Sequence, residues 1–190
     1  MRLIDLFHIE RDEITDLPDE PMNPADALRE AFGILTRRDE AVMRDVSECL
    51  AGTELYFSSI GELLERRGLN YSADAEPWLC VVGAVESALR AGYLKELRPG
   101  CSPDEFAAAL KEALAAVKIG FSPDKLLFVP QKGLEAWSSQ FNEYAGQSGI
   151  TLYFVEMYGE SKVMGAARIE DYAEAAEAAG YAGVKITSRP

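Results

Sequence analysis

The sequence predicts an α+β fold in which an N-terminal helical half packs on a C-terminal sheet of βαββαβ, ferredoxin-like topology. Three observations lead to this prediction. From about residue 24 to 118, apolar residues recur at the three- and four-residue spacing of helices. After Ser122, short runs rich in strand-forming residues alternate with helical patterns. The composition, with 48% hydrophobic and 27% charged residues, is that of a globular protein.

Capping residues mark several helices of the first half. Asn23-Pro24 places a capping Asn before a Pro at the first helical position, and Ser102-Pro103-Asp104-Glu105 repeats this arrangement with two acids at the positive helix end. A helix is also expected from about Arg38 to Ala51. The clearest helix runs from about Glu76 to Gly92, because it carries an apolar stripe at helical spacing. The stripe consists of Trp78, Val81, Val82, Val85 and Leu89.

The second half alternates between strand and helix patterns. Its predicted elements, in chain order, are a strand at Lys125–Val129, a helix at Gly133–Gln147, a strand at Ile150–Met157, a returning strand at Lys162–Arg168, a helix at Ile169–Gly180 and a strand at Val184–Thr187. The two middle strands are expected to form a hairpin. The order βαββαβ is that of the split-βαβ, ferredoxin-like arrangement.

Both faces of the strands at 125–129 and 150–157 are apolar, whereas a sheet with one face in water alternates apolar with polar residues. The helices at 133–147 and 169–180 are expected to cover one face. The N-terminal helices are then expected to cover the other face within the same chain. A homodimer packed sheet to sheet is the alternative.

A single composite domain over residues 1–190 follows, made of an acidic arm (1–23), a helical half (24–118) and an α/β half (122–188). The carboxylates of the arm are candidate partner-binding residues: Glu10, Asp12, Glu13, Asp16, Asp19 and Glu20. The alternative is a solvated linker, because such a segment has too little apolar area to offset the entropy of ordering.

The net charge of −13 limits the classes of partner. It repels phosphate backbones and anionic membranes, so we expect neither nucleic acid nor membrane as a partner. It attracts basic proteins, although acidity can also serve solubility alone. The chain has no 18-residue apolar run and a charged start, Met1-Arg2, and Cys49, Cys80 and Cys101 are widely spaced. We therefore expect reduced thiols and a cytoplasmic location.

Few catalytic chemistries fit the sequence. His8 is the single histidine, and His8-Ile9-Glu10 lacks the Pro-Cys-x-x-Cys partner of the zinc deaminase pattern. No glycine-rich phosphate loop is present. We predict no cofactor and no metal site, and no catalytic residue is assigned. Glu156, at the end of an apolar strand, is a candidate acid with a raised pKa. Alternatively it faces water or pairs with Lys162 or Arg168.

Two groups of residues carry a resemblance to a known family. They are Pro77-Trp78-Leu79 with Ala91-Gly92-Tyr93-Leu94, and Ser148-Gly149-Ile150-Thr151-Leu152 with the following hairpin and Ala-rich helix. Over residues 76–187 the chain resembles a bacterial family of unknown function that has a Pro-Trp-Leu helix, a Gly-Tyr-Leu turn and a C-terminal βαβ-like end. The resemblance implies no activity and no functional residue. The compact, acidic α+β shape is also similar to immunity proteins that neutralise bacterial toxins.

These observations favour a non-enzymatic binding or regulatory protein, immunity-like in character, that presents an acidic surface to a basic partner. Two alternatives stay open. The first is a carboxylate-based enzyme with a cleft between the helical half and the sheet, which requires at least two converging acids with raised pKa values. The second is a homo-oligomeric scaffold that pairs through the sheet.

Overall fold

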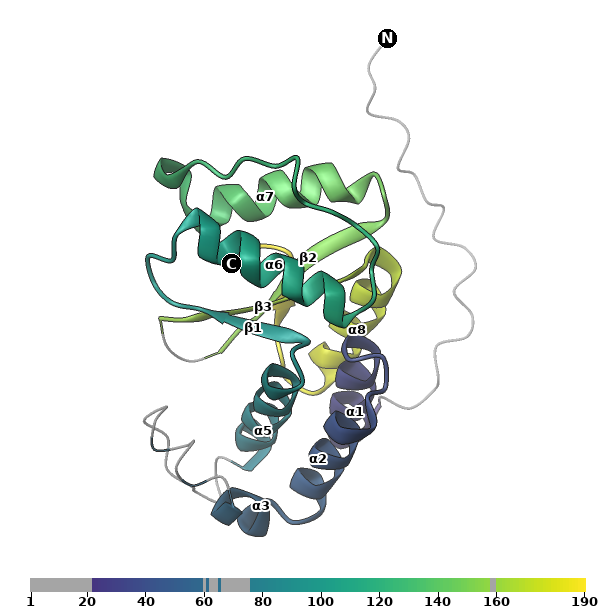
Figure 1. Cartoon of the computed structure of the whole chain (residues 1–190). Helices are drawn as coiled ribbons and strands as arrows, with labels where there is room; N and C mark the ends of the chain where they lie inside the picture. The colour runs from purple at the N-terminus through teal and green to yellow at the C-terminus, as the bar shows by residue number, and fades with distance from the viewer. Residues whose placement is uncertain (1–21, 60, 62–64, 66–75, 158–159) are drawn as a thin grey trace, which may run out of the picture.

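The computed structural model describes residues 22–59, 61, 65, 76–157 and 160–190, which form an α+β structure (Figure 1). In chain order its elements are α1 (Pro24–Leu35), α2 (Glu40–Ala51), α3 (Thr53–Ser59), α5 (Glu76–Arg90), β1 (Leu94–Leu97), α6 (Pro103–Ala116), the 3-10 helix η2 (Pro130–Lys132), α7 (Gly133–Gly146), β2 (Ile150–Val155), β3 (Lys162–Arg168), α8 (Ile169–Tyr181) and β4 (Ile186–Thr187). The helical N-terminal half and the C-terminal strands agree with the prediction.

The strands of the described residues form one antiparallel sheet in the order β1-β3-β2-β4. The central hairpin of β2 and β3 pairs Ile150 with Arg168 at one end and Val155 with Val163 at the other. This hairpin confirms the prediction for residues 150–168. The short strands β1 and β4 flank it as the two edges.

The ferredoxin-like topology is not confirmed, because the first strand comes from another part of the chain. The predicted strand at Lys125–Val129 is wrong: the segment forms no strand. The first strand of the sheet is instead β1, which lies in the predicted helical half and pairs with β3 at an edge of the sheet. Leu94 and Leu97 of β1 face opposite sides of the sheet, as a spacing of three residues requires in a strand.

Side chains of α7 explain why residues 125–129 do not join the sheet. The Trp137 indole N–H donates to the Val129 carbonyl at 2.8 Å, and the Gln140 amide donates to the Leu127 carbonyl at 3.4 Å. These bonds occupy backbone acceptors that a strand would offer to its neighbour. The Leu127 side chain is 81% exposed, so the apolar run does not represent a strand buried on both faces.

Helices cover both faces of the sheet (Figure 1). On one face lie α6 and α7, and on the other lie α8, α1 and α5. The expectation that the helices at 133–147 and 169–180 share a face is wrong, since α7 and α8 lie on opposite faces. The N-terminal helices do cover one face, but α6 packs beside α7 on the other. In the described residues, both faces of the sheet therefore pack against helices of the same chain.

The strand β2 shows how the two cores meet. Leu152 and Phe154 point toward α6 and α7, whereas Tyr153 and Val155 point toward α8 and α5. All four side chains are buried, which confirms the expectation of two apolar faces for this strand. Burying a side chain of this size contributes about 1.5–3 kcal/mol, so β2 stabilises both cores, as do β1 and β3.

Gly165 on β3 is required by the packing of its partner on β2. Tyr153 lies directly opposite Gly165, and a Cβ at this position would overlap the Tyr153 ring and approach Leu94 Cδ2 at 2.9 Å. The Tyr153 ring also stacks on Tyr172 of α8 at a centroid distance of 6.2 Å. The glycine thus allows a large aromatic side chain to lie flat over the sheet beneath α8.

The predicted caps of α1 and α6 are confirmed. The Asn23 side chain accepts a hydrogen bond from the Ala25 N–H at 2.8 Å. At α6, Ser102 Oγ accepts from the Glu105 N–H at 3.2 Å and Glu105 accepts from the Ser102 N–H at 2.7 Å, a complete capping box. Each cap stabilises its helix by about 1 kcal/mol, because it satisfies an amide that has no partner inside the helix.

Candidate functional site

The outer side of α8 carries a row of carboxylates that ends in a tyrosine. Glu170, Glu174, Glu177 and Tyr181 follow at i, i+4, i+7 and i+11, so they lie on one face of the helix, and all four are exposed. The opposite, Ala-rich face packs against α1. We call these four residues the acidic face of α8. No lysine or arginine lies within this helix.

Helix stability does not account for the acidic face. Glu170 lies in the first turn, where the helix dipole favours negative charge. Glu174 and Glu177 lie beyond that turn, and Glu177 stands near the negative end of the helix. Within the described residues these three glutamates form no ion pair, whereas Glu30 on neighbouring α1 pairs with Arg38 at 2.6 Å. Their charge is therefore directed to solvent.

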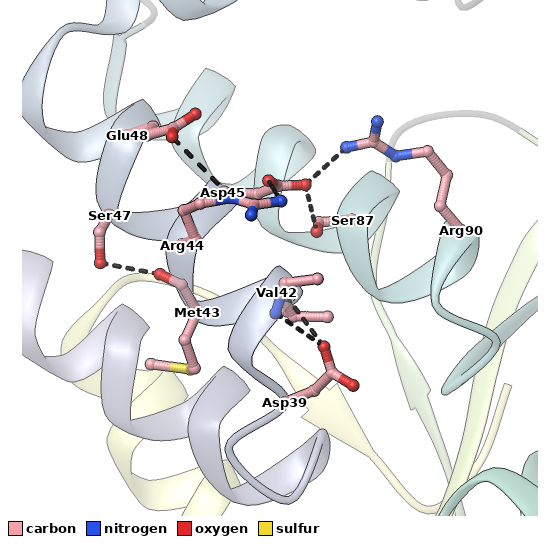
Figure 2. A network of polar contacts seen from close by, with 10 residues as sticks. Asp39, Val42, Met43, Arg44, Asp45, Ser47, Glu48, Ser87 and Arg90 are labelled. Carbon is pink, nitrogen blue, oxygen red and sulfur yellow. Dashed lines mark hydrogen bonds and ion pairs between the residues drawn. The ribbon is translucent and has the colours of Figure 1, made fainter.

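A second polar arrangement joins α2 to α5 (Figure 2). The Asp45 carboxylate of α2 accepts hydrogen bonds from Ser87 Oγ and from the Arg90 guanidinium, both at 2.8 Å and both from α5. Ser87 is buried, and the carboxylate of Asp45 is 19% exposed. Within the described residues no histidine stands beside Ser87 to act as a base. The arrangement is best understood as a connection between two helices.

Tyr56 of α3 lies next to this connection. A Cβ on Gly83 of α5 would stand 2.9 Å from the Tyr56 ring and 3.2 Å from Cys49 Sγ, so the glycine makes room for both side chains. Burial raises the pKa of Tyr56 to about 12, and the nearby Asp45 carboxylate raises it further than Arg90 lowers it. Tyr56 is therefore a neutral phenol at physiological pH.

Cys49 and Cys101 are not activated nucleophiles. Cys49 and Cys80 are buried at the contact of α2 with α5, and Cys80 Sγ lies 3.9 Å from the Cys49 carbonyl. The pKa of Cys49 is raised mainly by a hydrogen bond with Cys80 and to a smaller extent by burial. Burial and the Glu105 carboxylate raise the pKa of Cys101. Raised pKa values keep the thiols protonated, whereas a nucleophile is a thiolate.

A shallow groove of about 310 Å³ between β1 and α6 is lined by three carboxylates among the described residues, Glu96, Glu105 and Glu112. Two of them, Glu105 and Glu112, form ion pairs with Arg98 and Lys95. Glu112 accepts from Lys95 at 2.6 Å, and this bond lowers the pKa of Glu112. The pKa of Glu105 is lowered by its bond from the Ser102 backbone and then by Arg98. A general acid needs the opposite shift. Glu105 and Glu112 therefore do not supply the pair of acids with raised pKa values that the enzyme hypothesis requires.

The largest pocket that we describe, about 490 Å³, lies where the β2–β3 hairpin meets β4. We call it the C-terminal pocket. Three of its lining residues are cationic, namely Lys162, Lys185 and Arg189, and Glu156 is a lining carboxylate. Hydroxyl groups of Ser161 and Ser188 also line it, among others.

The sheet fixes the backbone around this pocket. The Glu156 N–H donates to the Lys185 carbonyl at 2.9 Å, which continues the pairing of β2 with β4. The Asn142 amide of α7 donates to the Ser188 carbonyl at 3.1 Å, and the Thr187 hydroxyl donates to the Arg189 carbonyl. The chain that carries Lys185 and Arg189 is thereby held on both sides of β4.

Glu156 lies on the rim of this pocket and forms an ion pair. Its carboxylate stands 3.0 Å from Lys185 Nζ, and the side chains of the two residues are 61% and 67% exposed. The sequence suggested water, Lys162 or Arg168 as its surroundings; the structure gives water and Lys185. A smaller cavity of about 280 Å³ reaches from Glu156 to Trp78 of α5, and Glu156 is its single carboxylate within the described residues.

The six carboxylates of the arm and His8 lie outside the described residues. Within the described part of the chain, no three His, Cys, Asp or Glu side chains come together as metal ligands, and none of the helices could cross a membrane. Sequence reasoning missed the three cations of the C-terminal pocket, because Lys162 begins β3 whereas Lys185 and Arg189 flank β4, and these two segments meet only in the folded sheet.

The comparisons with known proteins agree with a family of unknown function. The model of the family described as Domain of unknown function (DUF6630) matches residues 27–190. The chain belongs to this family. The match begins at α1, so DUF6630 includes the helical half as well as the segment that carries the resemblance from residue 76. No curated protein and no solved structure matches the chain.

Proposed function

We propose that this DUF6630 protein is a non-enzymatic binding protein that presents an acidic surface to a basic protein partner. The acidic face of α8 carries the proposal. It combines three glutamates without ion pairs in the described residues and the exposed Tyr181 on one side of one helix. Complementary charge speeds association and suppresses wrong partners, and tyrosine is among the residues that contribute most to interfaces.

The acidic arm at residues 1–23 extends the same proposal, since its carboxylates would add to the attraction. An immunity-like role is the narrower form, in which the basic partner is a toxin. The net charge of −13 supports a partner other than nucleic acid or an anionic membrane. We also propose a cytoplasmic location, which the absence of disulfides at Cys49, Cys80 and Cys101 supports.

Affinity capture from the native host tests the proposal. The baits are the wild-type chain, the triple variant E170Q/E174Q/E177Q and a matched control, E40Q/E135Q/E143Q. The control also removes three exposed carboxylates, but from α2 and α7. We expect the wild type and the control to retain the same basic protein at 0.1 M salt, and the α8 variant to retain it about tenfold less, because complementary charges at the contact are lost.

High salt adds a second criterion. Capture by the wild-type chain should fall steeply between 0.1 and 0.5 M salt, because screening shortens the reach of the charges to a few ångströms. A partner held equally by the α8 variant and the control, or one that is itself acidic, would overturn the proposal.

A further inference from the structure

The C-terminal pocket concentrates positive charge on a strongly acidic chain. The whole sequence has 19 lysines and arginines against 32 acids. Among the described residues, the side chains that line this pocket include three cations, Lys162, Lys185 and Arg189, and one carboxylate, that of Glu156. These described side chains therefore carry an excess of two positive charges, whereas the net charge of the chain is negative, and the solubility of an acidic protein does not require such an excess.

The fold brings these cations together from two segments of the chain. Lys162 is the first residue of β3, Lys185 precedes β4 and Arg189 follows it. The antiparallel pairing of β2 with both neighbours sets Lys162 and Lys185 at the same end of the sheet, and Arg189 lines the same pocket from the segment after β4. Because hydrogen bonds from α7 and Thr187 hold the backbone of residues 187–189, the position of the last cation is defined by the fold.

One wall of the pocket is apolar. It is formed by Tyr172 of α8, Met157 and Ile186. The stacking of Tyr172 on the fully buried Tyr153 fixes the orientation of this wall. The volume of about 490 Å³ lies within the range of small-molecule sites, and an apolar wall with a few convergent polar groups is typical of them.

We propose that the C-terminal pocket binds a small organic phosphate monoester, with the phosphate among the three cations and its organic part against Tyr172. A phosphate monoester carries a charge of about −1.5 to −2 at pH 7, which matches the excess positive charge of the lining. The hydroxyls of Ser161 and Ser188 can donate hydrogen bonds to the remaining phosphate oxygens. This inference does not depend on the partner proposed for α8.

The acidity of the rest of the chain does not prevent such binding. At physiological ionic strength, charges more than about 8 Å apart are largely screened. The electrostatic potential inside the pocket is therefore set mainly by the charges of its lining. Glu160 and Asp171 are the sequence neighbours of the lining residues Ser161 and Tyr172, and neither belongs to the lining. The competing charge is that of Glu156, whose ion pair with Lys185 a phosphate would replace.

The Glu156–Lys185 ion pair gives predictions of opposite sign. Isothermal titration calorimetry of the full chain at 0.15 M NaCl would use phenyl phosphate as the probe. Inorganic phosphate and phenol, which correspond to the two parts of the probe, would be titrated separately for comparison. We expect K185Q and R189Q each to weaken phenyl phosphate binding about tenfold, since each removes a charge-assisted contact. We expect E156Q to tighten it about threefold, since it frees Lys185.

The matched control is K125Q, which removes one exposed lysine from the loop before α7 and should leave the affinity within about twofold. Thermal unfolding of each variant confirms that it is folded. Inorganic phosphate should bind about tenfold more weakly than phenyl phosphate, and phenol should not bind measurably, because each lacks one part of the ligand. Four results would overturn the proposal. The first two are an absence of saturable phenyl phosphate binding and a loss of affinity in K125Q as large as that in K185Q. The other two are weaker binding of phenyl phosphate by E156Q than by the wild type, and binding of phenol or inorganic phosphate as tight as that of phenyl phosphate.

Discussion

The Tyr56 hydroxyl is buried between α2, α3 and α5, where it has no hydrogen-bond partner among the described residues. The phenol is tolerated there as a neutral group, because burial and the Asp45 carboxylate both oppose the phenolate. The ring fills the space that Gly83 leaves on α5. At this position the packing needs an aromatic ring, and the hydroxyl adds a dependence of stability on pH.

We expect stability to fall at high pH through Tyr56. The folded-state pKa of about 12 exceeds the ordinary value of 10, so the folded chain keeps a proton that the unfolded chain loses between these values. The contribution is complete below pH 10 and is lost as the pH rises through 12, with a total of about 3 kcal/mol.

Urea unfolding at pH 8 and pH 12 of the wild type and of Y56F measures this contribution. The phenylalanine variant keeps the ring and has no proton to lose, and other tyrosines with raised pKa values, such as Tyr153, are present in both proteins. The difference in unfolding free energy between the two proteins should therefore shift against the wild type at pH 12. An equal loss in both would show that Tyr56 is not the group responsible.

At the scale of the secondary-structure elements, Asp45 connects α2 to α5 through hydrogen bonds. Its carboxylate holds Ser87 and Arg90 at once, and Ser87 is buried. D45A should destabilise the fold by about 2 kcal/mol, because it leaves a buried hydroxyl without its acceptor. A double-mutant cycle with S87A should show a coupling energy of about 1 kcal/mol in urea unfolding.

An exposed pair inside one helix is the control for this cycle. The Arg29 guanidinium of α1 lies 2.7 Å from the Asp26 carboxylate. The two residues are three positions apart in the same helix, and both side chains are exposed. D26A should lower the free energy of unfolding by less than about 0.5 kcal/mol, because the ion pair is screened by solvent and joins residues of a single helix. Additive effects of D45A and S87A, or a larger cost for D26A than for D45A, would contradict the role given to Asp45.

Elements with local signals could be predicted from the sequence, and elements defined by distant partners could not. The caps at Asn23 and Ser102 and the hairpin of β2 and β3 depend on neighbouring residues. The strand β1 has the sequence Leu-Lys-Glu-Leu. Its two central charged residues give no strand pattern in the sequence, and the strand is defined by its pairing with β3. Residues 125–129 have the apolar pattern of a strand, but α7 takes two of their carbonyls.

At the scale of the whole molecule, the two proposed sites differ in how far the sequence could foresee them. The acidic character was evident from the composition, and the acidic face of α8 follows from helical spacing alone. The C-terminal pocket depends on the pairing of β2 with β3 and β4, so the convergence of Lys162, Lys185 and Arg189 needed the sheet order. One chain thus carries an acidic helix face and a cationic pocket.

The central claim, that a basic protein binds the acidic face of α8, is tested most directly by photo-crosslinking in the native host. A photoreactive phenylalanine analogue replaces Tyr181 on α8, and Tyr144 on α7 serves as the control because its exposed fraction is 37% against 44%. We expect a crosslinked adduct with one basic protein from position 181 and none from position 144. No adduct at position 181, or the same adduct at both positions, would contradict the claim.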